Sequence, residues 1–446
     1  MIKSLEQKFD PKRYEEEILR FWDENKVYKQ IKEKNMSSPR KFYFLDGPPY
    51  PSSNVPHVGT LWNKILKDSI VRYYRARGYR VNDQPGYDCH GLPIEVQIEK
   101  RLGFKTKKEI EDYGVERFIE ECKNFAKRNL EEMNLHFKNF GVSMDWDNPY
   151  LTMNNEYIES AWWLVKKAEE KGLLDYGLKV VHWCPRCETT LADYEVTEYK
   201  ELEDPSIYVK FPVAGEKNKY LLIWTTTPWT LPANVAVMAH PDLEYVWVEV
   251  NGEELLMLST RVSEVMKEAG IQNYRVVKSV KGKDLEGLKY IHPLEEEVTI
   301  QKLLRDYHRV VLSSEYVTSE EGTGLVHMAT GHGEEDYKVG VDHGFPVFSI
   351  LDDKGVMVKD AGKYAGIYHR DANSLIVEDL KKKGYLFHYG TIKHRYPVCW
   401  RCKTPLVLRA TRQWYIRVTQ LKEKFLEEAY NVCLLYTSDA ADERSS

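Results

Sequence analysis

The chain has 446 residues, enough for roughly three domains at about 150 residues each. Hydrophobic residues make up 42% of it and charged residues 30%, which excludes a mostly disordered chain. The formal net charge of −5 excludes binding to nucleic acid through an overall positive charge, so any such contact must use local patches. No apolar run approaches the roughly 20 residues of a membrane span, and residues 1–13 lack the apolar core of a secretory signal. We therefore expect a soluble cytoplasmic protein.

The first 82 residues predict a helical extension followed by a β–α–β unit. A helix begins at Asp10-Pro11, which offer an N-cap acceptor and a proline at the first helical position, and apolar residues at helical spacing continue it over 14–28. Residues 41–45 predict a short strand that runs into a turn-rich loop. A helix over 59–77 and a strand over 79–82 complete a unit typical of open parallel sheets.

The helix over 59–77 carries an apolar and a basic set of side chains. The apolar residues are expected to face inward: Leu61, Ile65, Ile70 and Tyr74. The basic residues predict a solvated charged face, with contact to nucleic acid as the alternative: Lys64, Lys67, Arg72, Arg75 and Arg77.

The rest of the chain changes from helical to β-rich near residue 198 and becomes helical again near residue 371. Asn251-Gly252 between two apolar runs predicts a tight hairpin. Helices are expected over 117–139, 162–171, 371–383 and 421–429, and strands over 206–212, 220–225, 245–250 and 253–258.

These elements predict an α/β chain in which a β-rich, barrel-like domain interrupts a Rossmann-type parallel-sheet nucleotide-binding domain. The helical extension would occupy residues 1–40. The two halves of the sheet domain would occupy 41–198 and 392–430, and the inserted domain 199–391. Residues 431–446 are polar and without period, which favours a truncation or a foreign junction over a frayed end.

Two loops of the predicted sheet are candidates for ligand binding. His57 and Gly59 lie where a helix begins after a strand, and free N–H groups there attract anions, although on these residues alone a capped helix with a buried histidine is the preferred explanation. Asp88, in the loop after the second strand, either pairs with an ammonium group or forms an Asx turn. Ligands in open α/β sheets bind outside the carboxyl ends of the strands, so both loops should face one crevice.

Four of the seven cysteines form two Cys-x-x-Cys pairs, Cys184 with Cys187 and Cys399 with Cys402. This spacing lets two thiolates share one tetrahedral Zn²⁺, and an odd cysteine count in such pairs favours metal binding over disulfides. A shared ion requires the two ends of the β-rich block to lie close together. The alternative is two independent pairs.

The β-rich block contains a second candidate site. Thr225, Thr226 and Thr227 offer hydroxyls at a strand end, Asp336 can hold an ammonium group, and His327 can contact a hydroxyl or a water. The alternative for the threonine run is β-propensity alone. The spacing of His327 and His332 also suggests a metal site, which we discount because His327 lies in an apolar strand without an obvious third ligand.

Together these motifs resemble the class I aminoacyl-tRNA synthetases, and most closely the isoleucine-specific ones, over nearly the whole chain to about residue 428. Gly-Tyr-Asp-Cys-His-Gly-Leu-Pro-Ile-Glu (86–95) is similar to the isoleucine-specific pattern and differs from the valine- and leucine-specific ones. Trp-Thr-Thr-Thr-Pro-Trp-Thr-Leu-Pro-Ala-Asn (224–234) fits the editing domain of the isoleucine and valine enzymes. Paired Cys-x-x-Cys motifs also occur in many isoleucine enzymes.

The resemblance implies that ATP, with Mg²⁺, and isoleucine react to isoleucyl-adenylate and pyrophosphate, and that the isoleucyl group then passes to its tRNA. His57, Gly59 and Thr60 match the H-I-G-H signature that binds ATP, with Thr60 in place of the last histidine. Gly47 and Pro48 would line the amino-acid pocket, with Asp88 on the α-ammonium group.

The resemblance also implies hydrolytic editing of valine products and a structural Zn²⁺ on the four cysteines, in a monomer. Thr225, Thr226, Thr227 and Asn234 would shape the hydrolytic pocket, with His327 at the terminal ribose or a water and Asp336 on the amino group of the substrate.

One departure concerns activity. The second ATP signature of the family, a lysine-rich K-M-S-K-S loop, is absent from these residues, and its charge stabilises the transferring phosphates. We therefore expect this chain to activate isoleucine poorly while it retains editing. The alternatives are a stand-alone deacylase of mischarged tRNA and a valine-specific synthetase.

Overall fold

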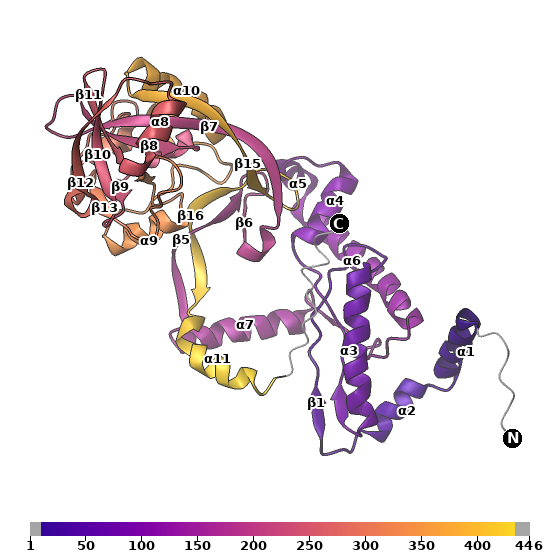
Figure 1. The fold of residues 1–446 in the computed structure, drawn as a ribbon. Helices are drawn as coiled ribbons and strands as arrows, with labels where there is room; N and C mark the ends of the chain where they lie inside the picture. The colour runs from indigo at the N-terminus through magenta and orange to yellow at the C-terminus, as the bar shows by residue number, and fades with distance from the viewer. Residues whose placement is uncertain (1–9, 433–446) are drawn as a thin grey trace. The chain divides into compact units, whose positions relative to one another are not determined.

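The computed structural model describes residues 10–432, apart from the side chain of Tyr194, and divides into two compact units (Figure 1). One unit comprises the residues up to Asp175 together with those from Ile416, and the other comprises Tyr176–Tyr415. Most of the predicted tail at 431–446 lies outside the described residues. Within residues 10–432, no helix combines the length and the apolar composition that crossing a membrane requires.

The first unit begins with two helices where the sequence predicts one. Asp10 caps α1 (Pro11–Glu24) by accepting a hydrogen bond from the backbone N–H of Arg13 at 3.4 Å, as predicted. The helix stops because Lys26 takes a left-handed conformation with φ +49°, and α2 (Val27–Lys34) then starts in a new direction (Figure 1).

The predicted β–α–β unit is confirmed. Strand β1 (Lys41–Tyr43) pairs in parallel with β2 (Arg80–Asn82), and α3 (Val58–Ala76) connects them. A second parallel pair, β3 (Gly86–Tyr87) with β4 (Tyr150–Leu151), follows. The other helices of this unit are α4 (Leu92–Leu102), α5 (Lys107–Tyr113), α6 (Val115–Asn139), α7 (Asn155–Glu170) and α11 (Lys422–Ala429).

The buried face of α3 is charged, contrary to the prediction. Ile65 was expected inside but is 39% exposed, whereas Lys64 is 1% exposed and Lys67 6%. Both lysines form ion pairs with the buried Asp46, Lys67 at 3.0 Å. Burial raises the pKa of Asp46, but the two ammonium groups outweigh it and hold the pKa below its ordinary value.

Arg75, one turn further along α3, is also buried and pairs with the buried Asp83. The predicted solvated face is therefore wrong for Lys64, Lys67 and Arg75. Two aspartates from the ends of neighbouring strands lie beneath the helix and replace water as partners of these cations. Arg72 stays partly exposed and pairs with Asp68 on its own helix.

The second unit is built on an open six-stranded sheet with the order β12-β10-β11-β8-β7-β15. Its edges, β12 and β15, do not pair with each other, so the described strands form no closed sheet and the expected barrel is not confirmed. The strands are β7 (Glu198–Pro212), β8 (Lys219–Thr225), β10 (Glu244–Val250), β11 (Glu253–Leu258), β12 (Arg275–Lys281) and β15 (Leu386–Val398).

Two smaller three-stranded sheets and three helices complete this unit. One sheet has the order β13-β9-β14 and the other β16-β5-β6. The second of these joins the two chain segments that lead into and out of the unit. The strands are β5 (Leu174–Cys184), β6 (Thr189–Leu191), β9 (Ala236–Ala239), β13 (Val310–Leu312), β14 (Leu325–Met328) and β16 (Val407–Ile416), and the helices are α8 (Val262–Glu268), α9 (Glu334–Asp342) and α10 (His369–Lys382).

The predicted hairpin at Asn251-Gly252 is confirmed. β10 and β11 pair antiparallel with Val250 opposite Glu253, which leaves a two-residue turn. Asn251 has φ +50° and Gly252 φ +84°, the backbone signs of a type I′ turn, and asparagine and glycine tolerate them best.

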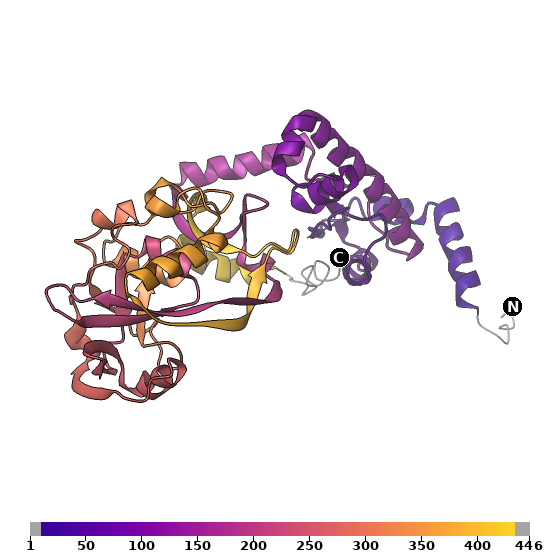
Figure 2. The same cartoon turned by 90° about the horizontal axis from the view of Figure 1, so that it is seen from above.

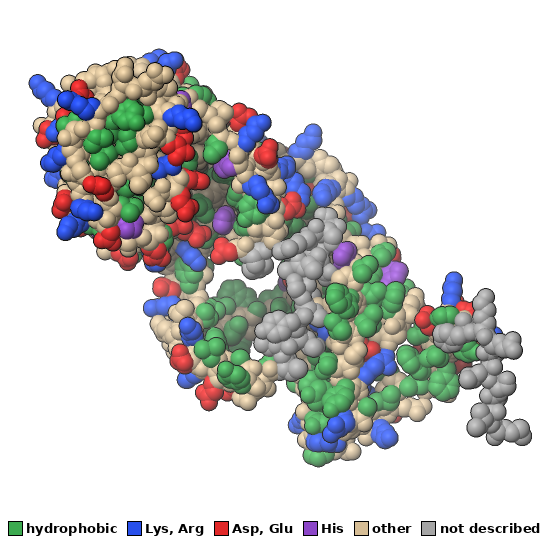
Figure 3. Space-filling view, viewed as in Figure 1, with side chains coloured by type: hydrophobic (Ala, Val, Ile, Leu, Met, Phe, Trp, Pro, Cys, Tyr) green, Lys and Arg blue, Asp and Glu red, His purple; other side chains and the backbone are tan. Residues whose placement is uncertain are grey.

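The longest pairing in the unit joins β7 and β15 antiparallel, from Val209 opposite Leu386 to Glu198 opposite Val398. Figure 2 shows the two strands as one extended ribbon. The visible surface of this unit carries interspersed positive and negative side chains, without a continuous basic area (Figure 3). The unit contains both cysteine pairs and is wider than the predicted inserted domain, whose functional bounds at 199 and 391 stay a prediction.

Replacing Asp46 with alanine should destabilise the first unit by about 3–5 kcal/mol, because two buried ammonium groups lose their partner. Urea unfolding at pH 7 measures the effect. The folded-state pKa of Asp46 is lowered, so its contribution is present above the unfolded pKa of about 3.9 and the difference from the parent should vanish as the pH falls through the folded value.

Glu17→Ala is the matched control, because the pair of Glu17 with Arg13 is solvent-exposed on both sides and should contribute less than about 0.5 kcal/mol. Equal midpoints for Asp46→Ala and Glu17→Ala would show that the buried pair does not stabilise the unit.

Candidate functional site

The helix start at α3 holds the first group of predicted site residues. His57 is the N-cap residue, and its Nδ1 accepts a hydrogen bond from the backbone N–H of Gly59 at 3.1 Å. The side chain of His57 is exposed, so the buried histidine of the alternative interpretation is wrong, although the capping role is present. Thr60 is 8% exposed and belongs to the buried face of the helix.

Two hydrogen bonds join the loop after β1 to the loop after β3. The N–H of Gly86 donates to Asp46 Oδ2 at 3.0 Å, and the N–H of Asp88 donates to the Pro49 carbonyl at 3.0 Å. These two bonds hold the residues on either side of Gly47 and Pro48 against the loop that contains Asp88, as expected for two loops at one crevice. The Gly47 carbonyl also accepts from Lys67 at 3.2 Å, which ties the loop to α3.

The sequence left undecided whether Asp88 forms an Asx turn, and the structure contains this turn. Asp88 Oδ1 accepts hydrogen bonds from the N–H of His90 at 3.2 Å and from the hydroxyl of Thr152 at 3.3 Å. The turn fixes the carboxylate beside the strand end. The role of Asp88 in binding an ammonium group stays a prediction.

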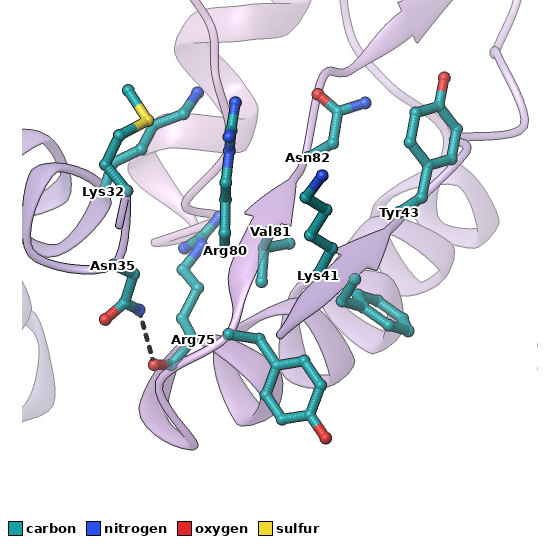
Figure 4. A pocket seen from close by; sticks show the side chains of 11 residues that line it. Lys32, Asn35, Lys41, Tyr43, Arg75, Arg80, Val81 and Asn82 are labelled. Atoms are coloured by element: carbon teal, nitrogen blue, oxygen red, sulfur yellow. Dashed lines mark hydrogen bonds between the residues drawn. The ribbon is translucent and has the colours of Figure 1, made fainter. Parts of the chain in front are cut away.

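A cavity of about 430 Å³ that the sequence did not indicate lies between α2 and the strands β1 and β2. Figure 4 shows Lys32, Lys41 and Arg80 lining it, with a hydrogen bond from Asn35 to the backbone carbonyl of Arg75. Lys32 and Arg75 form ion pairs with Asp83, which compensates part of the positive charge. None of the predicted site residues lines this cavity.

The four predicted cysteine ligands form one cluster. Their Sγ atoms all lie within 4.8 Å of one another, and those of Cys184 and Cys402 are 3.4 Å apart. A tetrahedral ion with metal–sulfur bonds of about 2.3 Å separates its sulfurs by about 3.8 Å, so the cluster fits one ion. The alternative of two independent pairs is therefore wrong.

Local backbone geometry forms the two knuckles of this cluster. Each Cys-x-x-Cys turn is followed by a residue in the left-handed region, Glu188 with φ +51° and Lys403 with φ +62°. The pairing of β7 with β15 brings the knuckles together, because Glu198 lies opposite Val398 just before Cys399. Hydrogen bonds among the four thiols lower the pKa of Cys399 and Cys402 and raise the pKa of Cys184, because the thiols share their protons within one cluster.

A cavity of about 330 Å³ lies at the end of β8 and contains most of the second predicted site. Thr225, Thr226, Thr227, His327 and Asp336 all line it, so residues far apart in the sequence converge there. Sequence reasoning missed further lining residues, among them Trp224, Thr230, Tyr316, Gly322, Thr323 and Gly324. Thr230 belongs to the same threonine-rich motif as Thr225, Thr226 and Thr227, and this motif could have identified it as a cavity residue.

Asn234 does not line this cavity. It is 0% exposed and lies behind His327, to whose Nδ1 its amide nitrogen is 3.2 Å away. Its predicted part in shaping the pocket therefore acts through His327 rather than by direct contact.

Asp336 is a partly buried carboxyl group at the cavity wall. Its Oδ2 accepts a hydrogen bond from the N–H of Ala329 at 2.9 Å, and no described lysine or arginine forms an ion pair with it. Burial raises the pKa of Asp336 to about 7. The group is therefore partly ionised near neutrality and is suited to bind a cation that enters the cavity.

His332, the second histidine that lines the cavity, forms hydrogen bonds with both of its ring nitrogens. His332 Nδ1 donates to the Leu408 carbonyl at 2.9 Å, and its Nε2 accepts from the N–H of Ile350 at 3.1 Å. Both nitrogens are thus used within the protein, which supports the decision to discount a metal site at His327 and His332. Burial lowers the pKa of each to about 4, so both rings are neutral at pH 7.

Comparison with known proteins agrees with this arrangement. Residues 17–443 match the family described as tRNA synthetases class I (I, L, M and V). The isoleucine–tRNA ligase of Saccharolobus islandicus is 56% identical over 432 residues, which are 97% of this chain and 41% of that protein. That of Pyrococcus abyssi is 55% identical over 439 residues, 96% of this chain and 41% of that protein.

The isoleucine–tRNA ligase of Methanocaldococcus jannaschii is 51% identical over 431 residues. The chain thus spans about two fifths of the length of the curated relatives it matches. With nearly the whole chain matched, it belongs to the class I tRNA synthetases.

Proposed function

We propose that the chain is part of an isoleucine–tRNA ligase, and that its second unit hydrolyses valine products attached to the isoleucine tRNA. The observation that carries the proposal is the cavity that unites three threonines, a neutral histidine and a partly buried carboxyl group that forms no ion pair with any described lysine or arginine. The naming of relatives at 51–56% identity as isoleucine–tRNA ligases supports the amino acid and weighs against a valine-specific enzyme.

In the first unit, the N-terminus of α3 would bind the phosphates of ATP. His57, Gly59 and Thr60 form its first turn, where N–H groups and the positive end of the helix dipole favour an anion. Gly47 and Pro48 would line the isoleucine pocket and Asp88 would hold the α-ammonium group, since hydrogen bonds join their two loops. Mg²⁺ would accompany ATP as a substrate.

In the second unit, the cavity would act as the second sieve. A missing methylene changes binding by only about 1–3 kcal/mol, a limit for which isoleucine-specific synthetases are themselves the standard example, so a hydrolytic site is needed to remove valine. Thr225, Thr226 and Thr227 would supply hydroxyls along one wall. Asp336 would bind the ammonium group of the misattached amino acid, and His327 would contact the ribose or a water.

The cysteine cluster would hold one Zn²⁺ with a structural role. The four thiolates would complete a tetrahedral shell and leave no open position for a substrate, since their sulfur atoms lie within 4.8 Å of one another. Arg186 Nη1 lies 3.9 Å from Cys187 Sγ, where its positive charge offsets part of the negative charge of a tetrathiolate site. Zn²⁺ bound there would stabilise the two knuckles at the base of the β7–β15 ribbon.

The proposed partners are isoleucine, ATP and the isoleucine tRNA, and a role in translation would place the protein in the cytoplasm. The proposed oligomeric state is a monomer.

Two assays test the proposal. The chain should hydrolyse valine from isoleucine tRNA that carries valine by mistake, and it should leave isoleucyl-tRNA intact. Isoleucine-dependent exchange of pyrophosphate into ATP reports activity at the ligase site. Because the K-M-S-K-S loop is absent from these residues, deacylation with weak or no exchange is the expected result. Strong exchange would contradict the expected weak activation of isoleucine, and a lack of deacylation would contradict the proposed hydrolysis.

Asp336→Asn should lower deacylation at pH 8 because a neutral amide no longer pairs with the ammonium group. In the parent the KM should rise as the pH falls through about 7, since protonation removes the carboxylate charge. Steady-state deacylation between pH 6 and 8.5 measures both effects. Asp342→Asn, exposed at the end of the same helix α9, is the control and should retain the pH profile of the parent.

Metal analysis should find about one Zn²⁺ per chain, and Cys402→Ser should lower that content and the thermal midpoint of the second unit. A strong chelator should reproduce the loss of stability in the parent. Cys122→Ala, a cysteine of the first unit outside the cluster, should keep the metal. Full metal content in Cys402→Ser would contradict the four-cysteine site.

A further inference from the structure

Both ring nitrogens of His327 have buried hydrogen-bond partners. Nε2 lies 2.8 Å from the hydroxyl oxygen of Thr230, and Nδ1 lies 3.2 Å from the amide nitrogen of Asn234. Which nitrogen carries the proton follows from the partners, because Asn234 and Thr230 each bond a backbone carbonyl, which can only accept.

The amide of Asn234 has one possible orientation. Its nitrogen end lies 2.9 Å from the carbonyl oxygen of Ala236, which can only accept. Its oxygen end faces the hydroxyl of Tyr290, which donates to it. A reversed amide would place two oxygens against each other, so the nitrogen end of Asn234 faces His327 Nδ1, which at 3.2 Å is nearer than the Met328 carbonyl at 3.5 Å.

The proton of His327 is therefore on Nε2. Since Nδ1 accepts from Asn234, a neutral ring carries its hydrogen on the other nitrogen. Thr230 fits this assignment, because its own hydroxyl donates to the Thr227 carbonyl at 2.8 Å and its oxygen remains able to accept from Nε2. The bonds run in one direction, from Tyr290 through Asn234 and His327 to Thr230.

We propose that Tyr290 and Asn234 are positioning residues that hold His327 as a fixed N–H donor at the wall of the hydrolytic cavity. The Nε2–H that donates to the Thr230 hydroxyl oxygen here turns to an oxygen of the substrate when one binds, so His327 assists hydrolysis as a hydrogen-bond donor and not as the general base. This inference rests on the proposed editing function.

The reaction balances without a proton transfer to His327. Water adds to the ester carbonyl, the bond from that carbon to the ribose oxygen breaks, and a proton that originates from the water ends on the ribose oxygen. The Nε2–H group stabilises charge on oxygen during this change. Besides the two histidines, the titratable groups that line the cavity are Glu321, Asp336 and the tyrosine hydroxyl of Tyr316.

Burial keeps this chain of bonds in place. Asn234 is 0% exposed and Tyr290 3%. Behind them, Gln301 donates to the Asn234 carbonyl at 2.9 Å, and its side-chain oxygen is 2.8 Å from His308 Nε2. Burial also lowers the pKa of His327 to about 4, which agrees with a neutral ring.

Nitrogen NMR of histidine-labelled protein reads the tautomer directly. The signals of His327, identified by their loss in His327→Gln, should report protonated Nε2 and unprotonated Nδ1 from pH 6 to 8. In Asn234→Asp the new carboxylate can only accept, so the proton should move to Nδ1 or the ring should become cationic. Protonated Nδ1 in the parent would overturn the proposal.

Deacylation of valyl-tRNA tests the role of the donor. Glutamine offers an N–H near the position of Nε2, so His327→Gln should retain substantial activity with the pH profile of the parent, while His327→Ala should lose about tenfold or more. Tyr290→Phe should lower kcat severalfold with little change in KM. Equal inactivity of His327→Gln and His327→Ala would favour a base and overturn the proposal.

Tyr364→Phe is the matched control. Tyr364 is likewise buried in the core of the second unit, but its hydroxyl donates to Asp379 at 2.8 Å. This variant should keep the parent's tautomer signals and its kcat. If the parent shows the Nε2–H tautomer but no deacylation, the proposed editing function fails and the catalytic role of His327 with it, while the assignment of the positioning residues stands.

Discussion

The antiparallel pairing of β7 with β15 is the constraint on which the second unit depends. It joins segments separated by almost the whole unit, with Glu198 opposite Val398 at one end and Val209 opposite Leu386 at the other. One end of the ribbon aligns the two cysteine knuckles. The other leads into the sheet whose strand β8 ends at the threonines of the cavity. The cysteine cluster and the cavity at the end of β8 thus depend on the same long-range contact.

Short sequence patterns predicted helix starts and tight turns well, because the residues that produce these features are neighbours in the sequence. Asp10-Pro11 starts a helix and Asn251-Gly252 makes a two-residue turn, whatever the rest of the chain does. The buried face of α3 was not predictable in this way, because Lys64 and Lys67 read as solvated until Asp46 is placed beneath them. The open form of the six-stranded sheet likewise depends on which strands meet, and strand runs alone do not specify that.

The candidate sites likewise contain some residues that sequence patterns identified and others that only the three-dimensional packing places. The spacing of Cys184 and Cys187 indicated a metal ligand pair, and the threonine triplet with Asp336 indicated a polar pocket, since those residue types carry their chemistry with them. The position of Asn234 behind His327, and the part of Tyr290, follow from packing between distant segments. In the first unit, the partial parallel pairs β1–β2 and β3–β4 agree with the predicted sheet, whose full extent stays a prediction.

The chain leaves the first unit at Asp175 and returns to it at Ile416, and the strands β5 and β16 that make these two crossings are neighbours in one small sheet. The second unit, some 240 residues long, is therefore an insertion into the first unit, and the two ends of this insertion are adjacent. Such a segment can be gained, exchanged or shed by recombination with little change to its host. The adjacent strands β5 and β16 thus allow the whole second unit to be inherited as a single module.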